Sequence, residues 1–285
     1  EAYGEKNISF GREQIIPKPL DPRLIYSVAP AVAKAAMDSG VAKNPIKDWQ
    51  KYEAELKARL GLDNELMRNI TAKAQSNPKK VVFAEADNVK ILKAAQVSYE
   101  EGVAFPILLG DRDVILELME EYNVELPEVT IIDPKADTEE ERRTNFGTEF
   151  FQRRKRKGLT EFEAVKLMRE RNHFGAMMVD MGFADAMITG LTRSYRSTVK
   201  PLLQIIGLEK DVKTAAGMYI LNTKRGPMFL ADTTVNLNPN ASQIAEITIN
   251  VAKTIRKLKV QPKIALLSYS NFGSSPGPDS EKMAE

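Results

Sequence analysis

The sequence predicts an α/β protein with two α/β subdomains, whose mainly parallel sheets are covered by helices on both faces and leave a cleft between them. Near-continuous apolar strands, KKVVFAEAD and AFPILLG, alternate with helical segments, and this pattern is typical of a parallel sheet. The strand ADAMITG followed by a helix repeats the pattern later in the chain. We expect the end of a preceding domain at 1–45, a linker helix at 46–77, and the subdomains at 78–136 and 137–285.

The composition indicates a soluble protein that handles a small molecule. Apolar residues make up 43% and charged residues 28% of the chain, with a net charge of only +2, so neither a nucleic acid nor a membrane is an expected partner. The chain has no cysteine and one histidine, His173, which excludes disulfides, zinc-thiolate sites and multi-histidine metal sites within it. No apolar run is long enough to span a bilayer, so we expect a cytoplasmic location.

The first subdomain is expected to hold three strands and two helices. The strands are expected at 79–87, 104–110 and 129–134, and the helices at 88–102 and 111–123. Asp111 or Asp113 is the expected N-cap of the second helix. Before this subdomain we expect a short helix at 31–39 that is closed by Gly40, and a linker helix with an apolar stripe that begins at Trp49.

The second subdomain is expected to begin with a helical block at 137–181. A strand at 184–190 and a helix at 195–206 follow it. Two strands at 214–222 and 226–234 are joined by a tight turn, TKRG, of the kind that hairpins use. A long amphipathic helix at 241–259 precedes a last buried strand at 263–270.

The loop 188–204, ITGLTRSYRSTVKPLLQ, is the first candidate ligand site. It follows a strand and enters a helix, a place where backbone N–H groups and the helix dipole favour an anion. The alternative is an ordinary connection with solvated arginines. The candidate ligand-binding residues are Thr189, Arg193, Ser194, Arg196, Ser197, Thr198 and Lys200.

Two further polar loops follow predicted strands in the same subdomain. In 231–247 the candidates are Asp232, Asn236 and Asn238, while Asn240 or Ser242 is suited to cap the next helix. In 266–283 hydroxyls and backbone N–H groups form a phosphate-type loop that does not match the GxxxxGK[ST] pattern. Its candidates are Ser268, Ser270, Gly273, Ser274 and Ser275. Three such loops together favour a cleft, and no residue is a candidate metal ligand.

Two other features have an ordinary interpretation as well as a functional one. The basic run at 153–157 is typical of a solvated helix face, with a patch that binds a phosphorylated ligand as the alternative. The methionine-rich stretch GAMMVDMG is typical of core packing. His173, which lies next to it, is expected to be packed or to cap a helix.

From about Lys79 onward the sequence resembles the phosphate acetyltransferase (phosphotransacetylase) family. The matching phrases include KGLTEFEAVKLMRERNHFGAMMVDMGFADAMITG, STVKPLLQ, FLADTTVNLNPNASQIAEI and IALLSYSNFGSSPGPDSEKM. The N-terminal FGREQIIPKPLDPRLIYSVAPAVAKAAMDSGVA is similar to the end of the catalytic region of bacterial NADP-dependent malic enzymes. Residues 1–45 are therefore assigned to that region, and together the two pieces resemble the two-part bacterial malic enzymes.

The family transfers an acetyl group between coenzyme A and phosphate. Its active members typically read HSTADTVRP where this chain reads RSYRSTVKP, so Ser197 replaces an Asp and Lys200 replaces an Arg. They also tend to read SYSTKGSA where this chain reads SYSNFGSS, so Phe272 replaces a lysine. Lysine does not reproduce the bidentate hydrogen bonding of arginine to phosphate. Further family catalytic residues, and the return of the chain to the first subdomain, would lie beyond Glu285.

The resemblance implies a regulatory domain that binds acetyl-CoA or CoA and supports self-association into a homo-oligomer. It assigns no catalytic residue to this chain. The full polypeptide would decarboxylate malate oxidatively to pyruvate, with NADP and Mg or Mn held upstream. An active phosphate acetyltransferase and a purely structural oligomerisation module are the alternatives. A site that no longer turns over can still bias a two-state assembly if its ligand prefers one state.

Overall fold

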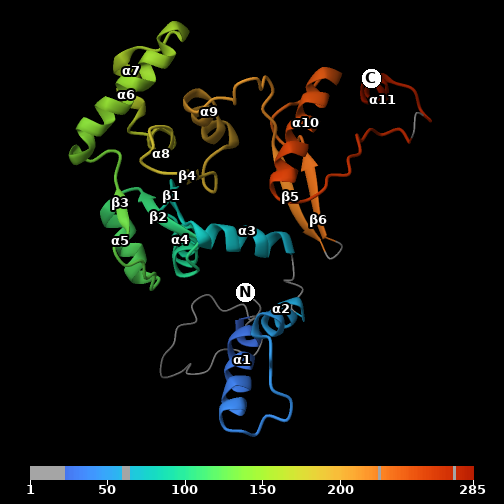
Figure 1. Cartoon of the computed structure of the whole chain (residues 1–285). Coiled ribbons are helices and arrows are strands. Elements are labelled where there is room, and N and C mark those ends of the chain that lie inside the picture. The colour runs from blue at the N-terminus through green and yellow to red at the C-terminus, as the bar shows by residue number, and fades with distance from the viewer. Residues whose placement is uncertain (1–22, 60–64, 224–225, 272–273) are drawn as a thin grey trace. The chain divides into compact units, whose positions relative to one another are not determined.

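The computed structural model describes residues 23–59, 65–223, 226–271 and 274–285 (Figure 1). The chain divides into two compact units. One comprises residues 1–68 and 219–230, and the other comprises residues 69–218 and 231–285.

The described residues of the first unit comprise two complete helices, the start of a third and most of a two-stranded hairpin. Helix α1 (Arg23–Asp38) packs against α2 (Trp49–Arg59), and Gly40 follows α1 with a left-handed φ of +74°, as expected of a glycine that ends a helix. The hairpin strands are β5 (Met218–Thr223) and β6 (Gly226–Ala231). The pair of strands predicted around the TKRG turn is therefore confirmed.

The second unit is built on a four-stranded sheet of order β3-β2-β1-β4, in which every pairing is parallel. Its strands are β1 (Lys79–Phe83), β2 (Ala104–Leu109), β3 (Thr130–Ile132) and β4 (Ala186–Ile188). The parallel sheet predicted from the apolar strands is confirmed. Strand β4, which belongs to the predicted second subdomain, pairs with β1 of the first.

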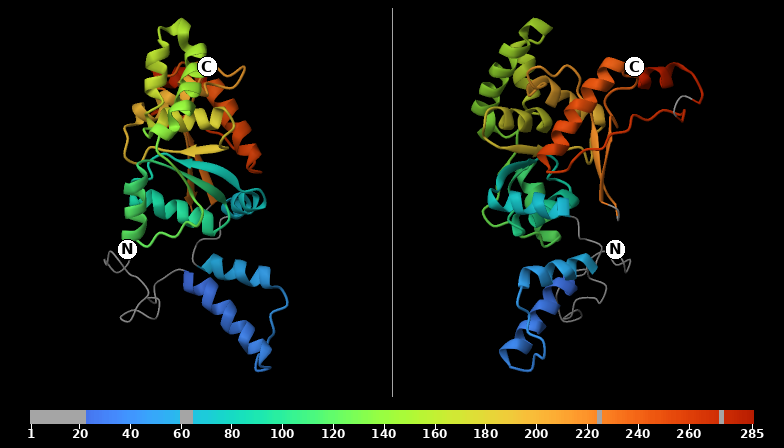
Figure 2. Two further views of the ribbon diagram at one scale, coloured as in Figure 1. Left: turned by 90° about the vertical axis from the view of Figure 1, so that its left-hand side faces the viewer. Right: turned by 45° about the vertical axis from the view of Figure 1, so that its right-hand side comes forward.

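Helices cover both faces of this sheet (Figure 2), because neighbouring residues of a strand point to opposite faces. On one face, Phe83 and Leu108 pack with residues of α4 (Val89–Glu100) and α5 (Arg112–Glu121). On the other face, Val82 and Leu109 pack with Phe146 of α6 (Glu140–Arg154) and Phe174 of α8 (Arg171–Asp180). These four strand residues are almost fully buried.

The remaining helices either pack against α6 and α8 or lie before or after the sheet in the chain. Helix α7 (Glu161–Leu167) packs against α6, and α9 (Tyr195–Ile205) packs against α8. Helix α3 (Glu65–Ser76) precedes the sheet, and α10 (Ala241–Lys257) and α11 (Pro278–Ala284) follow it.

Two predicted caps can be identified. The Asp111 carboxylate accepts the backbone N–H groups of Asp113 and Val114, and Asn240 rather than Ser242 caps α10.

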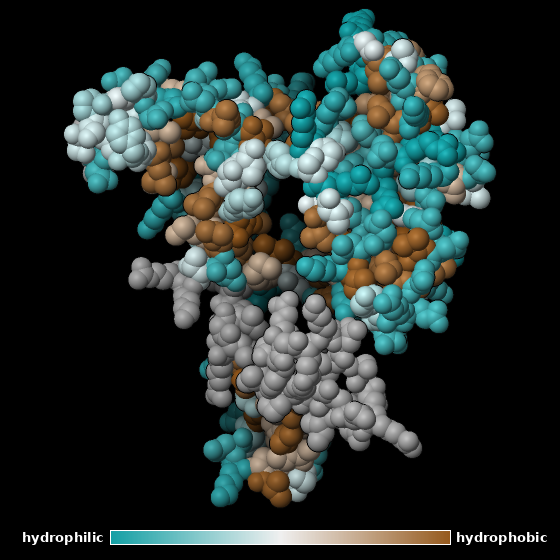
Figure 3. All heavy atoms as spheres, turned by 180° about the vertical axis from the view of Figure 1, so that it is seen from behind, coloured by the Kyte–Doolittle hydropathy of each residue, from teal (hydrophilic) through white to brown (hydrophobic). Residues whose placement is uncertain are grey.

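The predicted buried strand at 263–270 is wrong. The segment is irregular, and no other strand in the described parts of the chain pairs with it. Ile264 is 55% exposed and Leu267 is 76% exposed. Apolar side chains also lie among polar ones on the face of the molecule that Figure 3 shows. An apolar run predicts a strand only where a neighbouring strand satisfies its backbone hydrogen bonds.

Within the described ranges, no helix is both long enough and apolar enough to cross a membrane.

Candidate functional site

A cavity of about 1000 Å³ lies within the second unit. Its walls come from the end of β1, from the segment that runs from α6 to the start of α8, and from the loop that enters α9. Glu85 and Lys135 lie within the predicted first subdomain, whereas most other lining residues lie within the second. Five of the predicted ligand-binding residues line this cavity: Arg193, Ser194, Arg196, Ser197 and Lys200.

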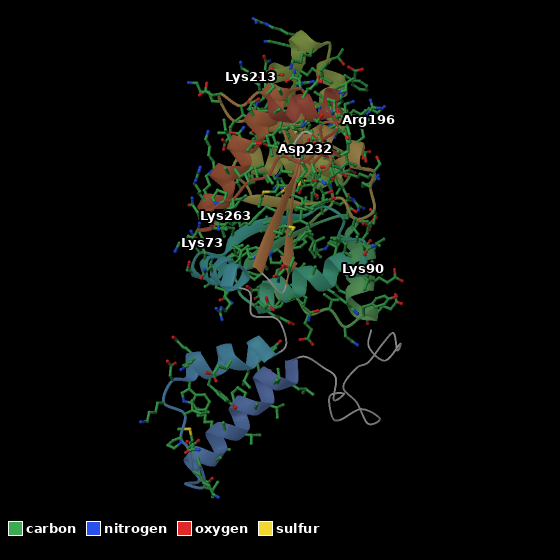
Figure 4. The ribbon with its side chains drawn as sticks, turned by 90° about the vertical axis from the view of Figure 1, so that its right-hand side faces the viewer. Lys73, Lys90, Arg196, Lys213, Asp232 and Lys263 are labelled. Atoms are coloured by element: carbon green, nitrogen blue, oxygen red, sulfur yellow. The ribbon has the colours of Figure 1, made fainter. Side chains whose placement is uncertain are left out.

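The cavity concentrates positive charge. Among the described residues that line it, nine are cationic and three are acidic, although the net charge of the whole chain is only +2. Arg193, Arg196 and Lys200 form one cationic wall; Figure 4 labels Arg196 on α9. This excess of positive charge suits an anionic ligand.

A second cationic wall includes part of the basic run. Arg154 ends α6 and Lys157 ends the short helix η2 (Lys155–Lys157), and both line the cavity. Arg153, in contrast, donates to Glu149 and Asp180 and does not line it. No carboxylate in the described part of the chain lies within 4.0 Å of the charged nitrogens of Arg154 or Lys157. The basic run is therefore divided between a surface ion-pair network and the cavity.

The backbone of the loop 190–192 already surrounds an anion, the carboxylate of Glu85. This side chain is only 2% exposed, and it accepts the backbone N–H groups of Gly190, Leu191 and Thr192 and the hydroxyl of Thr192. Burial by itself raises the pKa of Glu85, but hydrogen bonds from Thr192, Gly190 and Thr189 outweigh it and hold the pKa at about 2. The sequence suggested the backbone N–H groups of this loop for a ligand. Those of Gly190, Leu191 and Thr192 instead donate to a side chain of the protein itself.

Asn172 joins this loop to the first turn of α9. Its side-chain oxygen accepts the hydroxyl of Thr189 at 2.8 Å, and its side-chain nitrogen donates to the carbonyl of Ser197 at 3.3 Å. The same Thr189 hydroxyl lies 3.0 Å from Glu85 Oε1. Thr189 therefore holds the loop in place rather than lining the cavity.

The N-terminal end of α9 is fixed by its own hydroxyl groups. The Ser194 side chain caps the helix by accepting the backbone N–H of Ser197, and Thr198 is 7% exposed and donates to the carbonyl of Ser194. These hydrogen bonds hold the helix end from which Arg196 and Lys200 line the cavity.

The second predicted loop is organised by Asp232 (labelled in Figure 4). Its carboxylate accepts the backbone N–H groups of Gly217, Thr234 and Asn236, and the Asn236 side chain donates to it as well. Burial raises the pKa of Asp232, but these hydrogen bonds lower it to about 2. The Tyr195 hydroxyl donates to Thr234 at 3.3 Å, so this loop touches the first one without lining the cavity.

The other predicted residues take part in local contacts. Asn238 accepts from the Lys282 ammonium group. The Ser268 hydroxyl donates to the Ser270 carbonyl, the Ser270 hydroxyl accepts from Ser275, and the Ser274 backbone N–H donates to Asn271. Gly273 and Phe272 lie outside the described residues. Ligand binding by the second and third loops stays a prediction, because no described residue of either loop lines the cavity.

His173, which was predicted to be packed or to cap a helix, lines the cavity. Its ring lies edge-on to Phe150, with the ring centroids 6.0 Å apart. Burial lowers its pKa to about 4, against the opposing effect of Glu170 and with a smaller contribution from Lys200. The ring is therefore packed, as expected, but it also borders the cavity.

Sequence reasoning missed other residues of this site, among them Glu85, Asn172, Lys166 and Arg169. The acidic end of KKVVFAEAD was a usable signal for Glu85, since parallel strands end at the same edge of a sheet. Lys166 lies on α7, Asn172 lies on α8 and Arg169 lies between these helices, and the sequence does not specify how the helices pack.

The fold has counterparts in known proteins. Residues 65–285 match the family described as phosphate acetyl/butaryl transferase. A phosphotransacetylase from Streptococcus pyogenes superposes with a TM-score of 0.69 at 32% identity, over 76% of this chain and 65% of that protein. The chain belongs to the phosphate acetyl/butaryl transferase family.

Malic enzymes and phosphate acetyltransferases are both among the proteins that match the chain. The NADP-dependent malic enzyme of Escherichia coli (strain K12) is 40% identical over 285 residues, which are all of this chain and 38% of that protein. The phosphate acetyltransferase of Clostridium acetobutylicum is 32% identical over 75% of this chain and 65% of its own length. The chain therefore spans well under half of the malic enzyme and about two thirds of the acetyltransferase.

Proposed function

We propose that this chain is a regulatory domain of an NADP-dependent malic enzyme and that it binds acetyl-CoA as an effector. The observation that carries the proposal is the two-walled cationic cavity, which is lined by cations of α9 and by cations of the α6–α8 segment. Acetyl-CoA carries a pyrophosphate and a separate ribose phosphate. A site with two cationic walls suits such a ligand because each wall can neutralise a different phosphate.

The size of the cavity also supports this ligand. About 1000 Å³ is at the upper end of the range for small-molecule sites. A free phosphate ion fills only a small part of that volume, whereas an elongated cofactor ester can reach both walls.

The chemistry at the start of α9 favours binding over transfer. Where active acetyltransferases of this family typically show Asp and Arg, the cavity holds the Ser197 hydroxyl and the Lys200 ammonium group. The Ser197 hydroxyl donates to the Ser194 carbonyl at 2.8 Å, so it is part of the helix cap. A serine cannot act as a carboxylate base, and lysine binds phosphate as a point charge.

The match over the full length of the chain to malic enzymes supports the wider assignment. In this proposal the complete polypeptide decarboxylates malate oxidatively to pyruvate. NADP and a divalent metal bind in its upstream part, and the domain described here carries the regulation and supports homo-oligomer formation. A ligand that prefers one state of such an assembly shifts its equilibrium.

An active phosphate acetyltransferase is the second candidate function. It is favoured by the relation to the Clostridium acetobutylicum enzyme and by the three cations Arg193, Arg196 and Lys200 on one wall. Two measurements on the same protein separate the candidates. Calorimetric titration with acetyl-CoA is expected to show saturable binding, and an assay with acetyl phosphate and CoA is expected to show no acetyl-CoA formation. Vigorous turnover would support the second candidate, and the absence of binding heat would contradict both.

A further inference from the structure

His173 occupies an unusual position in the cavity wall. It lies in the first turn of α8, and together with Asn172 and Lys200 it lines the cavity. The Phe150 ring packs against it, so the imidazole is held on one side by the core. Neither the family match nor the three predicted loops assigns it a role.

The two ring nitrogens have different surroundings. Nδ1 is buried and has no hydrogen-bond partner within the described part of the chain. Nε2 is not among these buried atoms, so it is the ring nitrogen through which His173 could contact a ligand in the cavity that it lines. A neutral imidazole carries one proton, and a buried N–H without an acceptor costs about 1–3 kcal/mol. The proton is better placed on Nε2, where water or a ligand can accept it.

The charged neighbours are consistent with a neutral ring that donates. Lys200 on α9 disfavours a second positive charge, Glu170 at the N-cap of α8 favours one, and burial disfavours it most. A neutral donor among cations adds a hydrogen bond without adding to their mutual repulsion. Such a donor has directional preference, which the ammonium group of Lys200 lacks.

We infer that His173 is a ligand-binding residue of this cavity and that its Nε2–H group donates a hydrogen bond to an anionic phosphate oxygen of the bound molecule. This inference rests on the proposed function for the identity of the cavity as a ligand site. It deepens that proposal by adding a specific, uncharged contact to the cationic walls. It also gives the single histidine of the chain a role beyond packing.

Because His173 is the only histidine, ring-nitrogen NMR of the 285-residue chain reports on it alone. The free protein is expected to show the neutral tautomer with the proton on Nε2. Addition of acetyl-CoA, or of inorganic pyrophosphate as a simpler probe, is expected to shift the Nε2 resonance along the same saturation curve as calorimetric binding. A saturable calorimetric signal with an unmoved ring resonance, or a free tautomer protonated on Nδ1, would overturn the inference.

A matched set of variants separates ligand contact from packing. His173→Gln places an amide nitrogen near the position of Nε2 and is expected to keep the wild-type Kd within a few-fold. His173→Asn, whose amide corresponds to Nδ1, and His173→Phe are expected to raise the Kd about tenfold, the cost of a lost hydrogen bond to a charged group. Equal affinity in all three folded variants, or equal loss in all three, would contradict a donor role for Nε2.

The outcomes also distinguish this inference from the proposed function. If pyrophosphate binds and shifts the Nε2 resonance of His173 but acetyl-CoA does not bind, the proposed effector is wrong and the role of His173 stands. If acetyl-CoA binds and the ring is unaffected, the proposed function stands and the role of His173 is overturned. If neither probe binds, both are overturned.

Discussion

The carboxylate of Glu85 accepts both the backbone N–H and the hydroxyl of Thr192, a residue 107 positions further along the chain. Through this contact the end of β1 fixes the loop after β4. Because α9 begins only a few residues later, the position of its cationic wall depends on the same carboxylate.

Replacing Glu85 by Gln is expected to destabilise the protein. The amide keeps the shape of the side chain but directs an NH₂ group at donors of the loop, which leaves buried N–H groups without an acceptor. We expect a loss of about 2 kcal/mol in the free energy of unfolding, measured by urea denaturation. Glu117→Gln, at an exposed position of α5, is the control. Equal stability of the two variants would contradict the role of Glu85.

The hydrogen-bonded carboxylates of Glu85 and Asp232 predict how stability responds to strong acid. The pKa values of Glu85 and Asp232 are about 2, below their ordinary values of 4.5 and 3.8. The unfolded chain therefore binds protons first, and stability is lost as the pH falls from about 4.5 to about 2. Urea midpoints over this range are expected to fall less steeply for Glu85→Gln than for the wild type. Parallel curves would contradict the lowered pKa of Glu85.

His173 predicts a separate loss of stability at milder pH. Its pKa is lowered from 6.5 to about 4, so the unfolded chain gains a proton between these values while the folded chain does not. Stability is therefore expected to fall as the pH drops from about 6.5 toward 4. His173→Phe removes the titrating group and is expected to flatten the pH dependence in this window. An unchanged slope would show that the ring titrates normally in the folded state.

The packing of α6 on α7 predicts a glycine requirement. A Cβ added at Gly147 would lie 2.5 Å from the Cα of Val165, and the backbone there cannot move without separating the two helices. Gly147→Ala is expected to cost about 1 to 3 kcal/mol of stability, although alanine is the better helix former. Asn145→Ala, at an exposed position of the same helix, is expected to cost little. Thermal unfolding of the pair tests the difference.

The cationic wall predicts salt-sensitive binding. Lys200→Ala is expected to raise the Kd for acetyl-CoA about tenfold at low salt, with a smaller effect at high ionic strength because screening weakens the charge contact. Lys200→Arg is expected to retain binding. Lys90, an exposed lysine of α4 outside the cavity (Figure 4), provides the control variant Lys90→Ala. Equal Kd values for Lys200→Ala and the control would show that the ligand does not reach α9.

Much of the fold can be predicted from local patterns. Apolar runs predict the strands β1, β2 and β3, and helical spacing predicts α9. The capping chemistry of aspartate predicts Asp111 as the N-cap of α5. The segment 263–270 shows the limit of this reasoning. Its run of apolar residues, Ile264 to Leu267, is typical of a buried strand, yet pairing depends on a neighbour that the pattern does not specify.

The site was predictable only in part for a similar reason. Arg193, Arg196 and Lys200 follow from the rule that ligands bind beyond the carboxyl ends of strands, and they do line a cavity. That rule could not show that Glu85 already occupies the N–H groups of the loop. It also could not show that Arg154 faces the cavity while Arg153 pairs with Asp180. These facts depend on contacts between distant segments.

The most direct test is to measure binding and turnover on the same preparation of the 285-residue chain. Calorimetry with acetyl-CoA is expected to give a saturable isotherm that Lys200→Ala weakens and Lys90→Ala does not. A parallel assay with acetyl phosphate and CoA is expected to yield no acetyl-CoA. Formation of acetyl-CoA would contradict a purely regulatory site, and the absence of binding heat at high micromolar ligand would contradict the acetyl-CoA site itself.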